Sequence, residues 1–183
     1  MIEKSRKVDR LSLELGDITR FMGDAIVNAA NESLLGGGGV DGAIHATAGP
    51  DLLAECRALH GCATGQAKLT GGYHLSARHV IHAVGPVWYG GTRGEEALLA
   101  SAYRSCLELA EQYDLRTVAF PAISTGVYGY PLEEATRVAL RTILAWLGDH
   151  LLPEHVTCMC YNQRTLEMYE SVLASLIKEG RNA

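Results

Sequence analysis

The chain lacks the features that mark an exported, membrane-spanning or disulfide-bonded protein. None of its apolar stretches approaches the roughly 18 residues that a membrane span requires. The first ten residues, MIEKSRKVDR, carry charges but no apolar segment, so they differ from a secretory signal, and we expect a mobile arm over about residues 1–7. The five cysteines are an odd number without a C-x-x-C pair, which favours reduced thiols. These absences predict a cytoplasmic protein.

The chain also lacks an excess of positive charge, since 21 acidic residues outnumber 16 basic ones and the formal net charge is −5. Duplex binding draws its affinity from clustered Lys and Arg, so we expect no extended nucleic acid as a ligand. The composition is 48% hydrophobic, without biased tracts, which excludes disorder. A chain of 183 residues can bury one sizeable core, so we expect a single domain over residues 1–183, with a polar tail over about residues 179–183.

A metal site is not expected. Cys56, His60 and Cys62 could approach one zinc ion, but a fourth ligand at a recognisable spacing is missing. His45 and His82 are expected in or near the core rather than in catalysis. The sequence therefore predicts no resident metal and no cofactor.

Glycine is the residue in surplus, with 20 in 183, or about 11%, against a usual level of about 7%. Six glycines fall within residues 36–49, and others mark GPVWYGGTRG near residue 90 and STGVYG at 124–129. Such loops are the places in which to look for ligand chemistry.

Hydrophobic periodicity predicts strands that alternate with helices. Alternating or short continuous apolar runs predict strands at 11–15, 25–30, 66–70, 78–84, 116–122 and 155–161. Three- and four-residue spacing predicts helices at 40–49, 50–60, 94–113, 131–147 and 166–177. This alternation predicts an α/β domain with helices on both faces of a mixed sheet, because two strands follow one another early in the chain. Ligands of such domains bind at the carboxyl ends of strands, where GDIT, NAAN, GGGG and STGVYG all lie.

Two better-known glycine motifs do not fit. Gly37, Gly39 and Gly42 form G-x-G-x-x-G, but six residues separate it from the preceding strand and no carboxylate follows at the required distance. The AISTG segment has Ala122 in place of the first glycine of a serine-hydrolase elbow, and no triad partner is evident. Neither a dehydrogenase nor a serine hydrolase is expected.

The physical basis of phosphate binding remains, because glycines let backbone N–H groups approach an anion and a helix N-terminus adds positive potential. The glycine run at 36–39 and the loop at 124–129 together suggest a diphosphate site without basic side chains. Each loop alone is explained equally well as a tight connection that needs positive φ angles.

Four polar side chains flank these loops, and each has two interpretations. Asp17 is either a turn residue or an acceptor for an exocyclic amine such as that of adenine. Asp41 either stabilises a helix N-terminus by about 0.3–1 kcal/mol or positions and deprotonates water beside a ligand. Asn28 and Asn31 offer paired donors and acceptors for ribose hydroxyls, or they serve the backbone of a turn.

Five motifs in this order resemble those of the macrodomain family, and specifically its MacroD-type branch, which includes bacterial O-acetyl-ADP-ribose deacetylases. They are GDIT (16–19), IVNAAN (26–31), LLGGGGVDGAIH (34–45), HAVGPVW (82–88) and PAISTGVYGYP (121–131). The resemblance extends from about Leu11 to the last helix. It implies a three-layer α/β/α fold with a central mixed sheet and a cleft for ADP-ribose.

The resemblance also implies a role for each strand-end residue. Asp17 would bind the adenine amine, with the backbone of Ile18 alongside and Tyr161 against the adenine ring. Asn31 and Asp41 correspond to the pair implicated in hydrolysis at the distal ribose. The residues that would hold the diphosphate are Gly38, Gly39, Val40, Ser124, Thr125, Gly126, Val127 and Tyr128, of which Tyr128 would also close over the distal ribose.

The implied reaction is hydrolysis of an acyl ester on the distal ribose. O-acetyl-ADP-ribose would give ADP-ribose and acetate, and ADP-ribosyl esters on protein Asp or Glu would be cleaved in the same way. Asn31 would orient the ribose while Asp41 positions or activates water; alternatively, a ligand phosphate activates the water. Two other functions stay open, a non-catalytic ADP-ribose reader and a regulatory module that contacts protein or RNA.

Overall fold

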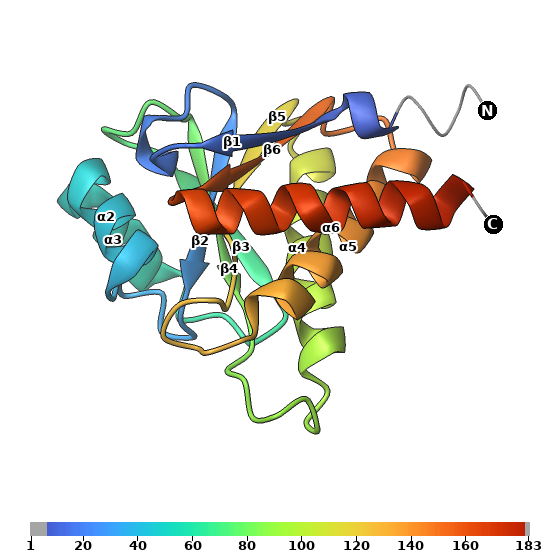
Figure 1. Ribbon diagram of the computed structural model, residues 1–183. Helices are drawn as coiled ribbons and strands as arrows, with labels where there is room; N and C mark the ends of the chain where they lie inside the picture. The colour runs from blue at the N-terminus through green and yellow to red at the C-terminus, as the bar shows by residue number, and fades with distance from the viewer. Residues whose placement is uncertain (1–6, 182–183) are drawn as a thin grey trace.

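The computed structural model has one six-stranded sheet between two layers of helices (Figure 1). It describes residues 7–181. The strands are β1 (Leu11–Leu15), β2 (Ala25–Ala30), β3 (Ala67–Gly71), β4 (His79–Val84), β5 (Thr117–Phe120) and β6 (His155–Cys160). A short 3-10 helix, η1 (Ile18–Arg20), precedes the helices α2 (Gly39–Ala48), α3 (Pro50–Ala58), α4 (Glu95–Gln112), α5 (Leu132–Asp149) and α6 (Gln163–Arg181).

The strand order is β1-β6-β5-β2-β4-β3, and neighbouring strands are parallel except for β3, which runs antiparallel to β4. The short connection between β3 and β4 permits that antiparallel pairing, whereas each parallel pair needs a longer crossover. The predicted mixed sheet is confirmed. The carboxyl ends of β1, β6, β5, β2 and β4 consequently meet at one edge.

The two-residue period of each strand divides the core between the two helical layers. In β2, Val27 packs into the cluster that contains residues of α4, α5 and α6, whereas Ile26 packs with residues of α2 and α3. In β4, Ile81 and Val80 divide in the same way. Figure 1 shows α2 and α3 on one side of the sheet and the other helices across it. The predicted three-layer α/β/α arrangement is confirmed.

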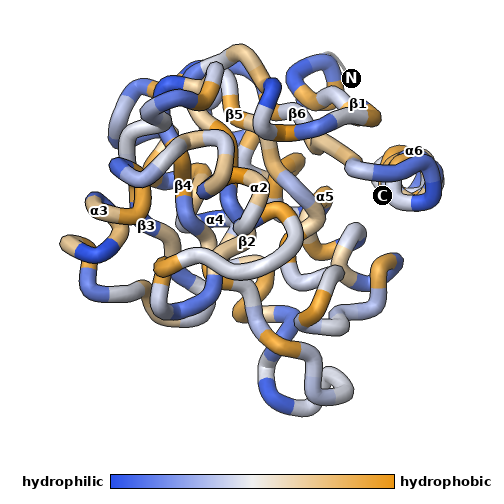
Figure 2. The backbone as a smooth tube through the Cα atoms, turned by 90° about the vertical axis from the view of Figure 1, so that its left-hand side faces the viewer, coloured by the Kyte–Doolittle hydropathy of each residue, from blue (hydrophilic) through white to orange (hydrophobic). Residues whose placement is uncertain are grey.

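The last helix runs further than the sequence predicts. Glu179, expected in a polar tail, belongs to α6 and pairs with Arg137 of α5 at 2.9 Å and Arg141 at 3.5 Å. Figure 2 shows α6 nearly end-on, with hydrophobic and hydrophilic residues on different sides. The expected N-terminal arm falls almost wholly outside the described residues, as do positions 182 and 183. No helix within the described ranges is both long and apolar enough to cross a membrane.

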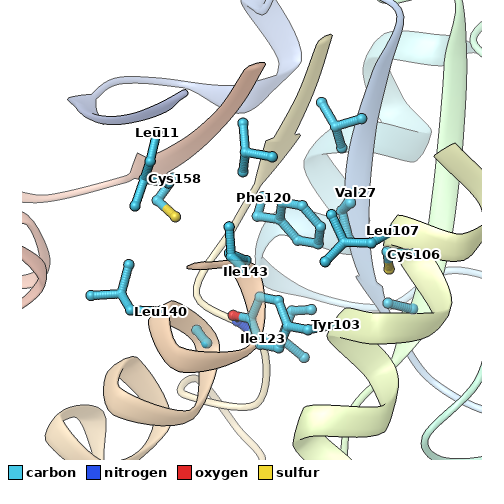
Figure 3. Close-up of a cluster of buried hydrophobic side chains, with 14 of the residues drawn as sticks. Leu11, Val27, Tyr103, Cys106, Leu107, Phe120, Ile123, Leu140, Ile143 and Cys158 are labelled. Carbon is cyan, nitrogen blue, oxygen red and sulfur yellow. The ribbon is translucent and has the colours of Figure 1, made fainter. Parts of the chain in front are cut away.

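One core tyrosine connects the α4 layer to the loop that follows β5. Tyr103 of α4 is 1% exposed and stacks on Phe120 with ring centroids 5.3 Å apart (Figure 3). Its hydroxyl donates to the Pro121 carbonyl and accepts from the Ile123 N–H, both at 3.3 Å. These bonds satisfy buried backbone groups that no strand pairs, so Tyr103 fixes the start of the 121–131 loop.

We expect Tyr103→Phe to lower the free energy of unfolding by about 1–3 kcal/mol, because it leaves those two buried backbone groups without their partner. Urea denaturation with an unchanged m-value measures the effect. Tyr113→Phe, at the exposed end of α4, is the matched control and should stay within about 0.5 kcal/mol of wild type. Equal stabilities of the two variants would contradict this role of Tyr103.

Candidate functional site

A cavity of about 820 Å³ lies at the edge where the parallel strands end. Such a volume is within the range of about 300–1,000 Å³ that is typical of small-molecule sites. Thirteen of the fourteen residues expected at the site line it. They are Asp17, Ile18, Asn31, Gly38, Gly39, Val40, Asp41, Ser124, Thr125, Gly126, Val127, Tyr128 and Tyr161.

One end of the cavity is formed by Asp17 and Tyr161, which follow the paired ends of β1 and β6. Asp17 caps η1, with Oδ1 accepting from the Thr19 hydroxyl at 2.7 Å and from the Thr19 N–H at 3.0 Å. These bonds lower the pKa of Asp17 below its ordinary value, so the side chain is an ionised acceptor at the cavity wall. Tyr161 is largely exposed and offers a ring face beside it.

The N-terminus of α2 forms one wall at the middle of the cavity. Its N-cap is Gly38, which makes no side-chain capping bond, so the first-turn N–H groups of the helix have no intrahelical partner. Among the described residues, no atom of a more distant residue lies within 4 Å of a β-carbon built at Gly38 or Gly39, so no side chain covers the backbone there. An uncapped helix N-terminus attracts an anion through its donors and its dipole.

The loop over residues 121–131 forms the facing wall. Ser124 adopts a φ of +67°, and its buried hydroxyl has no hydrogen-bond partner among the described residues. The Gly129 N–H donates to the Gly126 carbonyl at 3.0 Å, which closes a tight turn. Within the described chain, the N–H groups of Gly126, Val127 and Tyr128 make no hydrogen bond. A second set of unbonded N–H donors therefore belongs to a loop that lines the same cavity as the N-terminus of α2.

Asp41 lies in the first turn of α2 and is only 5% exposed. Its Oδ1 accepts from Asn28 Nδ2 at 2.8 Å and lies 3.4 Å from His45 Nε2. Burial raises the pKa of Asp41 above its ordinary value, and Asn28 and His45 oppose that shift in part. A carboxylate whose pKa is raised accepts a proton more readily than an ordinary aspartate does.

The second oxygen of Asp41 faces Asn31. A β-carbon placed on Gly37 would lie 3.1 Å from Asp41 Oδ2 and 3.5 Å from Asn31 Nδ2, so both atoms border one small space. Asn31 Nδ2 donates to the Gly36 carbonyl at 3.0 Å, and Oδ1 accepts from Ser33. A primary amide has two N–H hydrogens, which leaves one of them for a ligand.

Asn28 is the one expected site residue that does not line the cavity. It is 0% exposed and turns toward the α2 layer within β2, where Nδ2 bonds Asp41 Oδ1 and His82 Nδ1. The expectation that it binds the ligand is corrected: a residue inside the strand has its side chain in the core, whereas Asn31 follows the strand end. Asn28 instead orients the Asp41 carboxylate.

The chain of hydrogen bonds continues behind Asn28. His82 is buried, as expected, and burial together with His45 lowers its pKa to about 3, so the ring is neutral. Because Nδ1 accepts from Asn28, Nε2 carries the proton and donates to Thr70 Oγ1 at 2.9 Å. A neutral acceptor fixes the amide orientation in which Asn28 donates to Asp41.

Among the described residues, the cluster with metal-ligand chemistry is His45, Cys56 and His82, whose ligand atoms lie within 4.8 Å of one another. It differs from the Cys56, His60 and Cys62 group weighed from sequence. Burial raises the pKa of Cys56 to about 11, whereas metals bind the thiolate. His82 Nε2 is already bonded to Thr70. This cluster supports Asp41 and is not assigned a metal.

Several lining residues were not singled out from the sequence. Gly85 lies under the 121–131 loop, where a β-carbon would collide with the Ser124 hydroxyl. Asn162 caps α6 by accepting from the Thr165 N–H at 2.9 Å, and Arg164 adds a guanidinium at the Tyr161 end of the cavity. Their position directly after β4 and β6 is the signal that could have identified them.

Comparisons with known proteins agree with one another. The sequence profile of the Macro domain family matches residues 27–139. A macro domain-containing protein of Mesorhizobium japonicum is 56% identical over 95% of this chain and 99% of its own. The O-acetyl-ADP-ribose deacetylase of Salmonella gallinarum is 54% identical over 90% of this chain and 94% of its own. The Trypanosoma brucei macrodomain in complex with ADP-ribose has a TM-score of 0.84 and 47% identity, covering 90% and 69% of the two chains.

The raised pKa of Asp41 predicts a stability effect that depends on pH. The folded state binds the Asp41 proton more tightly than the unfolded state does, so stability is lost as pH rises from the unfolded pKa through the folded one. Asp41→Asn removes the charge and keeps an acceptor for Asn28. We expect a gain of about 0.5–2 kcal/mol at about pH 7.5, and almost none near pH 4.

Urea denaturation at both pH values measures the difference. Asp149→Asn changes an exposed carboxylate at the end of α5 and should alter stability by less than about 0.5 kcal/mol. A loss of stability in Asp41→Asn at neutral pH, or an equal gain at both pH values, would show that burial of the ionised Asp41 carboxylate does not destabilise the folded protein.

Proposed function

The chain belongs to the macrodomain family, and from that premise we propose that it binds ADP-ribose and hydrolyses acyl esters of its distal ribose. The T. brucei relative is bound to ADP-ribose, and the Salmonella relative is named for O-acetyl-ADP-ribose deacetylation. O-acetyl-ADP-ribose is therefore the substrate proposed first. Esters that join ADP-ribose to protein Asp or Glu contain the same bond and are proposed as further substrates. The five unpaired, buried cysteines favour a reducing compartment, and a cytoplasmic location is part of the proposal.

The lining of the cavity supports this proposal along its whole length. Adenine would lie against Tyr161 with its amine donating to the Asp17 carboxylate. The diphosphate would lie between the N-terminus of α2 and the 121–131 loop, which both line the cavity and both carry unbonded N–H groups. The distal ribose would then reach Asn31 and Asp41. Backbone donors explain how a chain with a net charge of −5 could bind a diphosphate.

The observation that carries the enzymatic proposal is the buried Asp41 carboxylate, aimed with Asn31 at one small space. Asn31 would donate its remaining N–H to a ribose oxygen. Water held by Asp41 Oδ2 would attack the ester carbonyl, the bond from that carbon to the ribose oxygen would break, and the proton taken by Asp41 would pass to the departing ribose oxygen. The products are a ribose hydroxyl and a carboxylic acid, which ionises at neutral pH.

For the adenine end, we expect Asp17→Ala to weaken ADP-ribose binding about 10- to 100-fold, the effect of losing a hydrogen bond to a charged acceptor. Titration calorimetry with ADP-ribose and GDP-ribose measures it. Wild type should prefer ADP-ribose, because a guanine carbonyl would face the carboxylate, and the variant should lose that preference. Asp149→Ala is the control, since α5 places it about 25 Å from Leu132, the end of the helix that borders the cavity. An unchanged preference in Asp17→Ala would remove Asp17 from base recognition.

For the reaction, we expect Asp41→Ala to lower kcat for acetate release by about 10²- to 10⁴-fold while ADP-ribose still binds. In wild type, activity should fall as pH drops through the pKa of Asp41, at a higher pH than for an ordinary aspartate, because burial raises that pKa. Asp41→Asn, which keeps the acceptor for Asn28, separates loss of the base from misfolding.

Two of the alternatives give their own results in these assays. ADP-ribose binding without turnover in wild type would make the protein a reader. Turnover that persists in both Asp41 variants would assign water activation to a phosphate of the ligand.

A further inference from the structure

A second cavity, of about 610 Å³, continues from the first beyond the proposed catalytic centre. The two cavities share Asn31, Gly85 and Tyr128. The remaining walls come from residues 32, 33 and 64 on one side and from the segment between β4 and α4, with the start of α4, on the other. Figure 1 shows that segment projecting from the body of the molecule at the bottom of the view.

The position of this cavity defines what could fill it. If adenine lies at Asp17 and the distal ribose at Asn31, then the group esterified to the ribose points toward the second cavity. An acetyl group has two carbons and would leave most of the space empty, since 610 Å³ is the volume of a complete ligand site. The cavity therefore suits a larger acyl donor.

The wall formed by the 85–94 segment is held rigidly. Glu95 is 1% exposed, and its two carboxylate oxygens accept N–H bonds from Tyr89 at 2.9 Å, Gly91 at 3.2 Å and Arg93 at 2.6 Å. Trp88 N–H donates to the Tyr128 carbonyl at 2.8 Å, which joins this wall to the loop of the first cavity. The Glu95 carboxylate therefore fixes the backbone of this segment, and its oxygens are occupied by backbone donors rather than available to a ligand.

The side chains on the two walls differ in hydrogen-bonding character. The Arg93 guanidinium lies over the Tyr89 ring, 4.3 Å from its centroid, and makes no ion pair with any residue of the described chain. Across the cavity, Glu32 Oε1 accepts from the Thr64 hydroxyl at 2.7 Å and N–H at 3.2 Å, which leaves Oε2 available. One wall thus offers donors and the other an acceptor.

A polypeptide matches this pair of walls, because its backbone carries both carbonyl acceptors and N–H donors. A nucleic acid backbone carries acceptors and negative charge, which Glu32 would repel. We propose that the second cavity binds the polypeptide segment that carries an ADP-ribosylated Asp or Glu. This inference rests on the proposed hydrolysis of distal-ribose esters. Arg93 determines specificity there by donating to oxygens of that segment. Water adds to the ester carbonyl, the ribose oxygen leaves with a proton, and the protein regains its carboxylate.

The test compares two substrates in matched charge reversals. Arg93→Glu should lower kcat/KM for a Glu-ADP-ribosylated peptide about tenfold or more. The same substitution should lower kcat/KM for O-acetyl-ADP-ribose less than about twofold, because this substrate would not reach Arg93. Arg93→Lys should recover part of the peptide activity. Arg57→Glu, an exposed residue of α3 outside both cavities, should change neither substrate. An equal loss on both substrates, or no loss on the peptide, would overturn the proposal.

A binding experiment distinguishes failure of this proposal from failure of the proposed function. In an Asp41→Ala background, fluorescence anisotropy compares the ADP-ribosylated peptide with ADP-ribose alone, so no turnover is needed. Adding Arg93→Glu should weaken the peptide about tenfold and leave ADP-ribose unchanged. Equal affinities for the peptide with and without Arg93 would refute the polypeptide site even if O-acetyl-ADP-ribose is hydrolysed. Tighter binding of an ADP-ribosylated oligonucleotide than of the peptide would also refute it.

Discussion

The hydrogen bond from Asn28 to Asp41 is the constraint around which the site is built. A carboxylate that is 5% exposed is costly unless donors and positive potential compensate for its burial. Asn28 supplies the donor from β2, and the N-terminus of α2 supplies the potential. The same bond links β2 to the first turn of α2, and the N-terminus of α2 lines the first cavity. His82 and Thr70 hold Asn28 in its donating orientation, so the constraint reaches as far as β3.

The fold separates the groups that give stability from those that contact ligand. The two hydrophobic clusters lie above and below the sheet, whereas the first cavity is lined mainly by loops beyond the strand ends. A few side chains bridge the two regions. Tyr103 ties the helical layer to the 121–131 loop, and Glu95 ties α4 to the wall of the second cavity. These buried polar contacts let flexible sequences form walls of defined shape.

The spacing of apolar residues predicted most of the helices and strands, because a period of 2 or 3.6 residues shows which side of a strand or helix faces the core. It also predicted that the strand-end loops gather at one edge. Asn28 was wrongly predicted to bind the ligand because the NAAN motif was assigned to the site as a whole. Asn28 lies within β2 with its side chain in the core, whereas Asn31 follows the end of the strand. The second cavity could not be predicted, since Glu32, Thr64 and Arg93 are far apart in sequence and only the order of the strands brings them together. The length of α6 was underestimated because its last turn depends on Arg137 of another helix.

The open backbone donors of α2 and the 121–131 loop have a consequence for the conditions in which the cavity works. Lys and Arg patches lose affinity for anions as ionic strength rises, because mobile ions screen exposed charges over about 10 Å. Peptide dipoles held inside a cavity at contact distance are screened much less. Arg164 at the cavity mouth is the part of this surface most open to screening. The affinity for an anion that is bound mainly by backbone N–H groups would therefore change little between low and high ionic strength.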